Sequence, residues 1–120
     1  MEQEITTPGN VQWVGDSKER LQAFPELVRK DIGHALYRVQ IGETPPSAKP
    51  MRGIESGVFE LVDTYATDTY RAVYTVKIGR SLYVLHCFQK KSKRGIRTPK
   101  RDIDLIKRRL RRAKEMEKEL

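Results

Sequence analysis

The sequence has a single cysteine, no long apolar run and fewer acidic than basic residues, and each feature limits the class of protein it can be. Because Cys87 is the only cysteine among 120 residues, neither an internal disulfide nor a cysteine-based zinc site can form. No stretch approaches the roughly 18 apolar residues that a membrane-spanning helix needs. The N-terminal residues are acidic and polar, so we expect no signal peptide. A cytoplasmic protein is the simplest expectation.

The excess of basic over acidic residues makes the chain strongly basic. There are 16 Asp and Glu against 24 Lys and Arg, which gives a formal net charge of +8 and a pI near 9.8. A positive charge of this size favours RNA, DNA, an acidic protein or an anionic membrane surface as the partner. The sequence has no glycine-rich phosphate loop, metal-ligand cluster or nucleophile elbow. We therefore expect no small-molecule cofactor and no metal.

The chain divides into a flexible N-terminus at residues 1–10 and a single domain at residues 11–120. The first elements expected in the domain are a strand at 11–15, helices at 18–24 and 25–42, and a proline-rich loop at 43–53. Asp16 and Ser17 are N-cap candidates for the first helix, and Pro25 fits the first turn of the second.

From Gly57 onward the hydrophobic period changes to about two, which predicts strands. These strands are expected at residues 58–65, 69–79 and 81–89. Their short connections imply an antiparallel meander. One face of the middle strand mixes charged and apolar side chains, so we expect it to be only partly covered; its residues are Arg71, Val73, Thr75 and Lys77.

The last strand leads into a strongly basic segment and then a charged helix. Thr98 is an N-cap candidate for that helix, and Pro99 suits its first position. The helix has one narrow apolar seam of helical spacing, formed by Ile103, Ile106, Leu110 and Ala113.

Four stretches in this order resemble the RelE/ParE superfamily of bacterial toxins, and most closely its HigB-like, phage-derived branch. They are "KPMRG" at 49–53, "GVFELVDTY" at 57–65, "YRAVYTV" at 70–76 and "LYVLHCFQKKSKRGIRTP" at 82–99. Trp13 near the N-terminus also suits that branch, and the resemblance spans residues 11–113.

The resemblance implies an α+β fold, with two N-terminal helices packed on a small antiparallel sheet and a C-terminal helix beside the other face. The strand of Trp13 is expected to pair with the meander as an extra edge. The implied activity is metal-independent cleavage of messenger RNA in the ribosomal decoding site, in which the ribose 2′-OH attacks the adjacent phosphate. The implied partners are messenger RNA, the ribosome and a cognate antitoxin, expected to be of the helix-turn-helix type.

The resemblance places candidate catalytic residues on the sheet and at its basic exit. Arg71 is the first choice for a transition-state phosphate contact, because a guanidinium can fork onto two oxygens. The structural alternative for Arg71 is a cross-strand pair with Glu60, which could itself serve as a base. Lys90 and Lys91 point to opposite sides if the strand continues, so without a bulge at most one of them shares the Arg71 pocket.

The other candidates are a histidine, an aromatic ring and the basic exit. His86 shares one face of the expected strand with Leu82, Val84 and Phe88, and such a lone histidine is more often a core residue than a proton-transfer group. Phe88 could stack an RNA base or pack in the sheet. The remaining RNA-binding candidates are Lys93, Arg94 and Arg97. The chain end offers no Tyr or His, which leaves the general acid unassigned.

Two other functions remain open on the sequence alone. One is a gyrase-poisoning toxin of the ParE type, and the other is a noncatalytic, basic nucleic-acid-binding module. The antitoxin is expected to contact either the basic exit at residues 90–101 or the apolar seam of the C-terminal helix.

Overall fold

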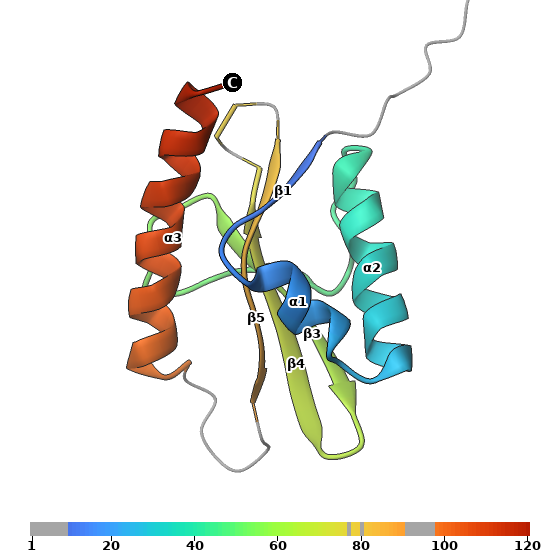
Figure 1. Cartoon of the computed structure of the whole chain (residues 1–120). Coiled ribbons are helices and arrows are strands. Elements are labelled where there is room, and N and C mark those ends of the chain that lie inside the picture. The colour runs from blue at the N-terminus through green and yellow to red at the C-terminus, as the bar shows by residue number, and fades with distance from the viewer. Residues whose placement is uncertain (1–9, 77, 80, 91–97) are drawn as a thin grey trace, which may run out of the picture.

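The computed structural model describes residues 10–76, 78–79, 81–90 and 98–120 (Figure 1). The elements are, in chain order, β1 (Val11–Trp13), α1 (Ser17–Gln22), α2 (Glu26–Gln40), β2 (Ala48–Pro50), β3 (Val58–Tyr65), β4 (Asp68–Thr75), β5 (Leu82–Lys90) and α3 (Lys100–Lys118). Every strand and helix expected from the sequence is present near its expected bounds. The predicted flexible N-terminus lies almost entirely outside the described residues.

The strands form one sheet in the order β1-β5-β4-β3-β2. β1 pairs with β5 as expected, but the pairing is parallel, whereas all other pairs are antiparallel. The sheet is therefore mixed, and the expectation of a purely antiparallel sheet was wrong. No hairpin joins β1 to β5, since two helices and three strands come between them, so no short turn imposes an antiparallel direction. β2 lies inside the expected loop, at a sheet edge where Pro50 is tolerated.

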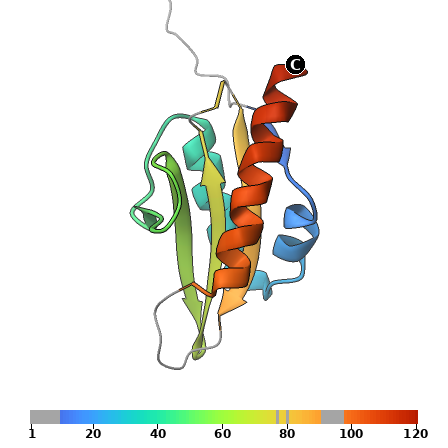
Figure 2. The same cartoon turned by 90° about the vertical axis from the view of Figure 1, so that its left-hand side faces the viewer.

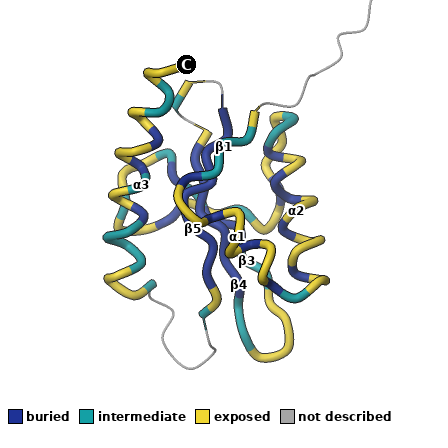
Figure 3. The backbone as a smooth tube through the Cα atoms, viewed as in Figure 1, coloured by how far each residue is buried: buried dark blue, intermediate teal, exposed yellow. Residues whose placement is uncertain are grey.

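Helices cover both faces of the sheet. α2 and α3 lie on opposite sides in Figure 1, and Figure 2 looks onto α3 as it crosses in front of the sheet. The core on the side of α1 and α2 includes Leu21, Val28, Ile32, Leu36, Ala72 and Leu82. The core on the side of α3 includes Met51, Val73, Leu85, Ile106 and Leu110. Two cores on one sheet explain how a short chain buries both sheet faces (Figure 3).

A β-bulge in β5 changes which side chains share a face. Val73 lies opposite His86, but the next residue, Tyr74, lies opposite Val84, so Leu85 is the extra residue. Val84 faces the helix α2 core, whereas Leu85 and Phe88 face the α3 core. His86, whose ring stacks on Phe88, also faces α3. The sequence analysis placed His86 on one face with Leu82, Val84 and Phe88; the bulge makes this wrong for Leu82 and Val84 and right for Phe88.

The mixed face of β4 is buried. Val73 is fully covered, Thr75 is almost fully covered, and even the charged Arg71 retains only 8% of its surface. Apolar residues of the α3 core, including Met51 and Val58, lie on the same side of the sheet. The expectation of partial cover was wrong for these three residues, and Lys77 lies outside the described part of the chain.

Helix α3 is attached to the sheet by its apolar seam and by polar contacts beside that seam. Ile106, Leu110 and Ala113 are buried as their spacing predicted. The Arg109 guanidinium donates to the Leu85 carbonyl over 2.9 Å and to the Asp16 carboxylate over 2.7 Å. Nearer the C-terminus, the Tyr83 hydroxyl donates to Glu117 over 2.6 Å. Within the described residues, no helix is both long and apolar enough to cross a membrane.

Candidate active site and a neighbouring arginine cleft

The β3–β4 pairing brings Glu60 and Arg71 together on the sheet face that α3 partly covers. Glu60 lies opposite Val73, and Arg71 lies opposite Val62, so the two charged residues are diagonal neighbours on one face. Arg71 Nη1 donates to Glu60 Oε1 over 2.8 Å, and each side chain is only 10% exposed. Arg71 Nε is buried and has no hydrogen-bond partner among the described residues. The ion pair is therefore almost completely removed from water, and the Nε–H group of Arg71 makes no hydrogen bond with a described residue.

Lys90, at the end of β5, belongs to the same electrostatic site. Its backbone lies opposite Thr69, whose hydroxyl donates to the Lys90 carbonyl over 3.3 Å. Burial lowers the pKa of Lys90, the positive charge of Arg71 lowers it further, and the Glu60 carboxylate opposes both effects. A lysine with a lowered pKa exchanges its proton more readily near neutral pH. Lys91 lies outside the described residues.

His86 is held inside the molecule. Its ring is fully buried, and its Nε2 lies 2.8 Å from Asp102 Oδ1 at the start of α3. Burial lowers the pKa of His86 more than the Asp102 carboxylate raises it. The ring is therefore neutral near pH 7, with Nε2–H as the donor to Asp102. In this position His86 connects α3 to β5 and does not reach the surface.

Phe88 lies directly opposite Arg71 on the neighbouring strand. Its ring is 6% exposed and stacks on the His86 imidazole, with centroids 4.8 Å apart. The structure thus brings Glu60, Arg71 and Lys90 together and places His86 and Phe88 in the adjacent core. The predicted RNA-binding residues Lys93, Arg94 and Arg97 lie outside the described residues.

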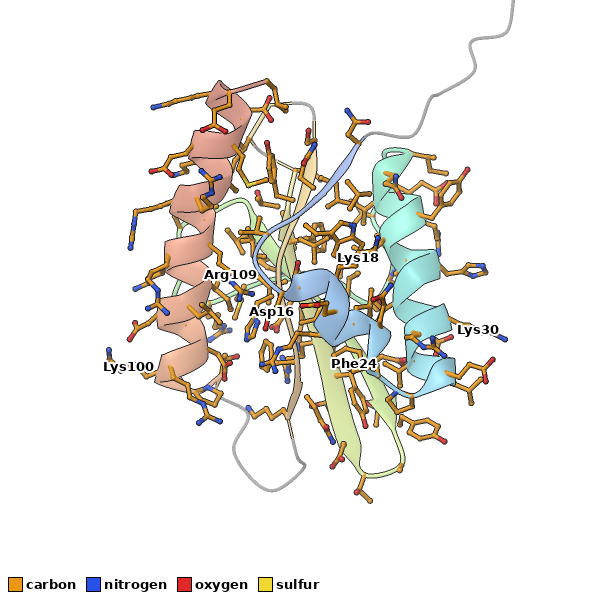
Figure 4. All side chains as sticks on the ribbon, viewed as in Figure 1. Asp16, Lys18, Phe24, Lys30, Lys100 and Arg109 are labelled. Atoms are coloured by element: carbon orange, nitrogen blue, oxygen red, sulfur yellow. The ribbon has the colours of Figure 1, made fainter. Side chains whose placement is uncertain are left out.

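A second feature, which we call the arginine cleft, lies beside β5 between α1 and α3. Its volume is about 570 Å³. Its lining residues are Arg20, Ala23, Phe24, Cys87, Phe88, Gln89, Arg101, Asp102, Leu105 and Arg108. In Figure 4, Asp16 and Arg109 meet between the two helices, and Phe24 lies at the far end of α1.

Sequence reasoning missed the arginine cleft. The i, i+7 spacing of Arg101 and Arg108 places both on one helical face, which was a detectable signal. Nothing in the sequence connected that face to Arg20, because the two meet only through the packing of α1 and α3 against β5. Among the described residues, no group of three or more His, Cys, Asp or Glu side chains is placed to hold a metal ion.

Comparisons with known proteins agree on one family and one fold. Residues 19–111 match the family described as "Phage derived protein Gp49-like (DUF891)". Among solved structures, a chain of the RelBE2 toxin–antitoxin complex from Mycobacterium tuberculosis is similar, with a TM-score of 0.50 and 16% sequence identity. The alignment covers 75% of the present chain and 100% of that chain, so the two share the RelE-like fold. No curated protein matches this sequence.

Proposed function

The chain belongs to the family of phage-derived Gp49-like proteins, and on that premise we propose that it is the toxin of a type II toxin–antitoxin pair. The similarity of its fold to a chain of a toxin–antitoxin complex supports this proposal. The motifs of residues 82–99 favour the HigB-like branch. The proposed partner is an antitoxin of the helix-turn-helix type that is encoded alongside.

The proposed activity is metal-independent cleavage of messenger RNA on the ribosome. The observation that carries it is the cluster of Glu60, Arg71 and Lys90, in which a carboxylate, a guanidinium and a lysine of lowered pKa meet on one sheet face. Cleavage of RNA by its own 2′-OH needs a base, a cationic phosphate contact and an acid. The cluster holds one residue suited to each role.

The proposed roles follow from the contacts. Glu60 accepts the 2′-OH proton while the 2′ oxygen forms a bond to phosphorus. Arg71 binds a phosphate oxygen through an N–H group that is not used on Glu60 and stabilises the added negative charge of the transition state. Lys90 donates a proton to the departing 5′ oxygen. The products are a 2′,3′-cyclic phosphate and a 5′-hydroxyl, with no water consumed.

The test is to add the purified protein to a translating extract and map the ends of the messages. Cleavage should survive EDTA and should fail when the ribose at the cut site is 2′-deoxy. Dependence on a divalent metal, or cleavage at a 2′-deoxy site, would count against the mechanism. Cleavage of free RNA in the absence of ribosomes would remove the ribosome from the proposal and leave the chemistry intact.

One observation favours a second candidate, a noncatalytic basic RNA-binding module. Arg71 and Glu60 retain only 8% and 7% of their surface, a degree of burial that a purely structural ion pair would also show. For this candidate the same extract would show bound RNA with uncut ends.

A further inference from the structure

The arginine cleft is separate from the proposed cleavage site. Arg71 lies on β4, whereas the cleft borders the opposite edge of β5, and α3 packs over β5. β1 pairs with β5 only as far as Val84, and farther along β5 the residues Cys87, Phe88 and Gln89 line the cleft. The cleft therefore offers room for an additional extended segment alongside β5.

The walls of the arginine cleft carry positive charge that the described residues leave largely uncompensated. Arg20 belongs to the α1 wall, where its nearest carboxylate oxygen, on Asp16, is 3.8 Å away. Arg101 and Arg108 belong to the α3 wall, are exposed, and form no salt bridge with a described residue. Asp102 is the one carboxylate among the lining residues, and it is hydrogen-bonded to His86. An anionic occupant fits these walls.

The floor of the arginine cleft decides between a peptide and a nucleic acid. Phe24 and Phe88 are only 9% and 6% exposed. Phe24 packs against Tyr70 and Phe88 stacks on His86, so neither presents a free ring face on which a base could stack. The small parts of these two rings that remain exposed, together with Leu105, give the cleft an apolar floor that can contact an aliphatic side chain.

We propose that the arginine cleft docks an extended, acidic peptide segment of a partner protein. Alternate side chains of an extended segment point to opposite sides, so its carboxylates can reach Arg20 on one wall and Arg101 and Arg108 on the other. An aliphatic side chain of the segment packs on the floor. The proposal specifies the chemistry of the segment; that the segment belongs to an antitoxin rests on the proposed function.

The test uses a short synthetic peptide of alternating acidic and aliphatic residues, with fluorescence anisotropy as the readout. The double variant Arg101→Glu/Arg108→Glu reverses the charge on the α3 wall of the cleft from positive to negative. The matched control, Lys107→Glu/Arg111→Glu, makes the same change in net charge on another exposed face of the helix. We expect the cleft variant to bind the peptide at least about tenfold more weakly than the control variant does. Circular dichroism checks that both variants are folded.

Three outcomes would overturn the proposal. The first is equal binding of the peptide by the two double variants, which would show that only net charge matters. The second is that the wild-type protein binds a peptide whose acidic residues are replaced by glutamine as tightly as it binds the acidic peptide. The third concerns a short single-stranded RNA. If the cleft variant, measured against its control, loses more affinity for this RNA than for the peptide, the cleft is assigned to RNA.

Failure of this inference is distinguishable from failure of the proposed function. Peptide binding needs neither ribosomes nor RNA cleavage, so it can be measured on a protein that cuts nothing. If messages stay uncut while the peptide still discriminates between the two double variants, only the proposed function fails. If messages are cut but the peptide does not discriminate, only the docking proposal fails.

Discussion

At the scale of single residues, the Glu60–Arg71 pair joins stability to the proposed chemistry. Arg71→Ala leaves the Glu60 carboxylate buried without its partner, so we expect a loss of about 3 kcal/mol in the free energy of unfolding. Thermal and urea melts of the purified variant measure the loss. An unchanged melt would show that the pair contributes nothing to stability.

Arg71→Lys separates the two roles of this residue. Lysine retains the positive charge beside Glu60 but lacks the planar fork that binds two phosphate oxygens. We expect a protein that melts close to the wild type and cleaves RNA about a hundredfold more slowly. The measurement is the initial rate of cleavage in a translating extract, beside a melt of the same preparation. Wild-type cleavage by this variant would mean that Arg71 does not contact the phosphate.

His86 should make stability depend on pH. Its pKa is lowered in the folded state, so below the ordinary histidine pKa of about 6.5 the unfolded chain binds a proton that the folded chain resists. The contribution of His86 to the free energy of unfolding is therefore fully present above that pH, and it is lost as the pH falls toward the pKa of His86 in the folded state. We expect the free energy of unfolding of the wild type to fall, relative to that of His86→Asn, as the pH is lowered from 7 to 5.

The control for His86 is the other histidine of the chain. His34 is exposed on α2, and His34→Gln removes it as the matched substitution. Urea melts of the three proteins at several pH values supply the comparison. If the free energies of unfolding of His86→Asn and the wild type changed with pH in the same way, the pKa of His86 would be the same in the folded and unfolded states.

At the scale of the elements, the attachment of α3 depends on a narrow seam. Leu110 is 4% exposed, and Leu110→Ala should cost about 3 kcal/mol because the truncated side chain leaves a cavity under the helix. Leu120→Ala, at a residue that is 75% exposed, makes the same chemical change and should be nearly neutral. Melting curves of the two variants test the pair. Similar losses in both would contradict the docking of α3 through its seam.

The elements also show how far the sequence could lead. β3 was predicted at its observed bounds, because its alternating pattern ends at clear turn residues. The bulge in β5 could not be predicted, because the residues from Leu82 to Phe88 are almost all apolar. With apolar residues on both faces of the strand, a register shift of one residue does not change the hydrophobic pattern of the sequence. That shift moved His86 to the face of α3. Ile106 and Leu110 of the α3 seam are buried against the sheet in this structure, whereas the sequence analysis offered that seam as one of two places for a partner; the partner contact stays a prediction.

The candidate site was predictable only in part for a related reason. The cross-strand pairing of Glu60 with Arg71 was one of two readings weighed for Arg71, because the strands and their short turn were clear from the period. The pKa of Lys90 depends on burial and on the distance to Arg71, which no spacing along the chain reveals. Arg20 and Arg108 come together only in three dimensions.

At the scale of the whole molecule, the net charge of +8 should govern how quickly an acidic antitoxin finds the protein. We expect the association rate to fall about tenfold or more between low and physiological salt, because ions screen the attraction that steers the encounter. The dissociation rate should change less, since buried contacts set the residence time. Stopped-flow kinetics across a salt series measures both rates. An association rate that is indifferent to salt would remove electrostatic steering.

The parallel pairing of β1 with β5 also determines how late in translation the sheet can be completed. Val11 leaves the ribosome early, but its partner Leu82 is made much later, and α3 must follow before the second core can close. The nascent chain cannot complete its sheet until most of the message has been read. A growing copy of this protein therefore lacks the complete sheet, and with it the cluster of Glu60, Arg71 and Lys90, until β5 has been synthesised.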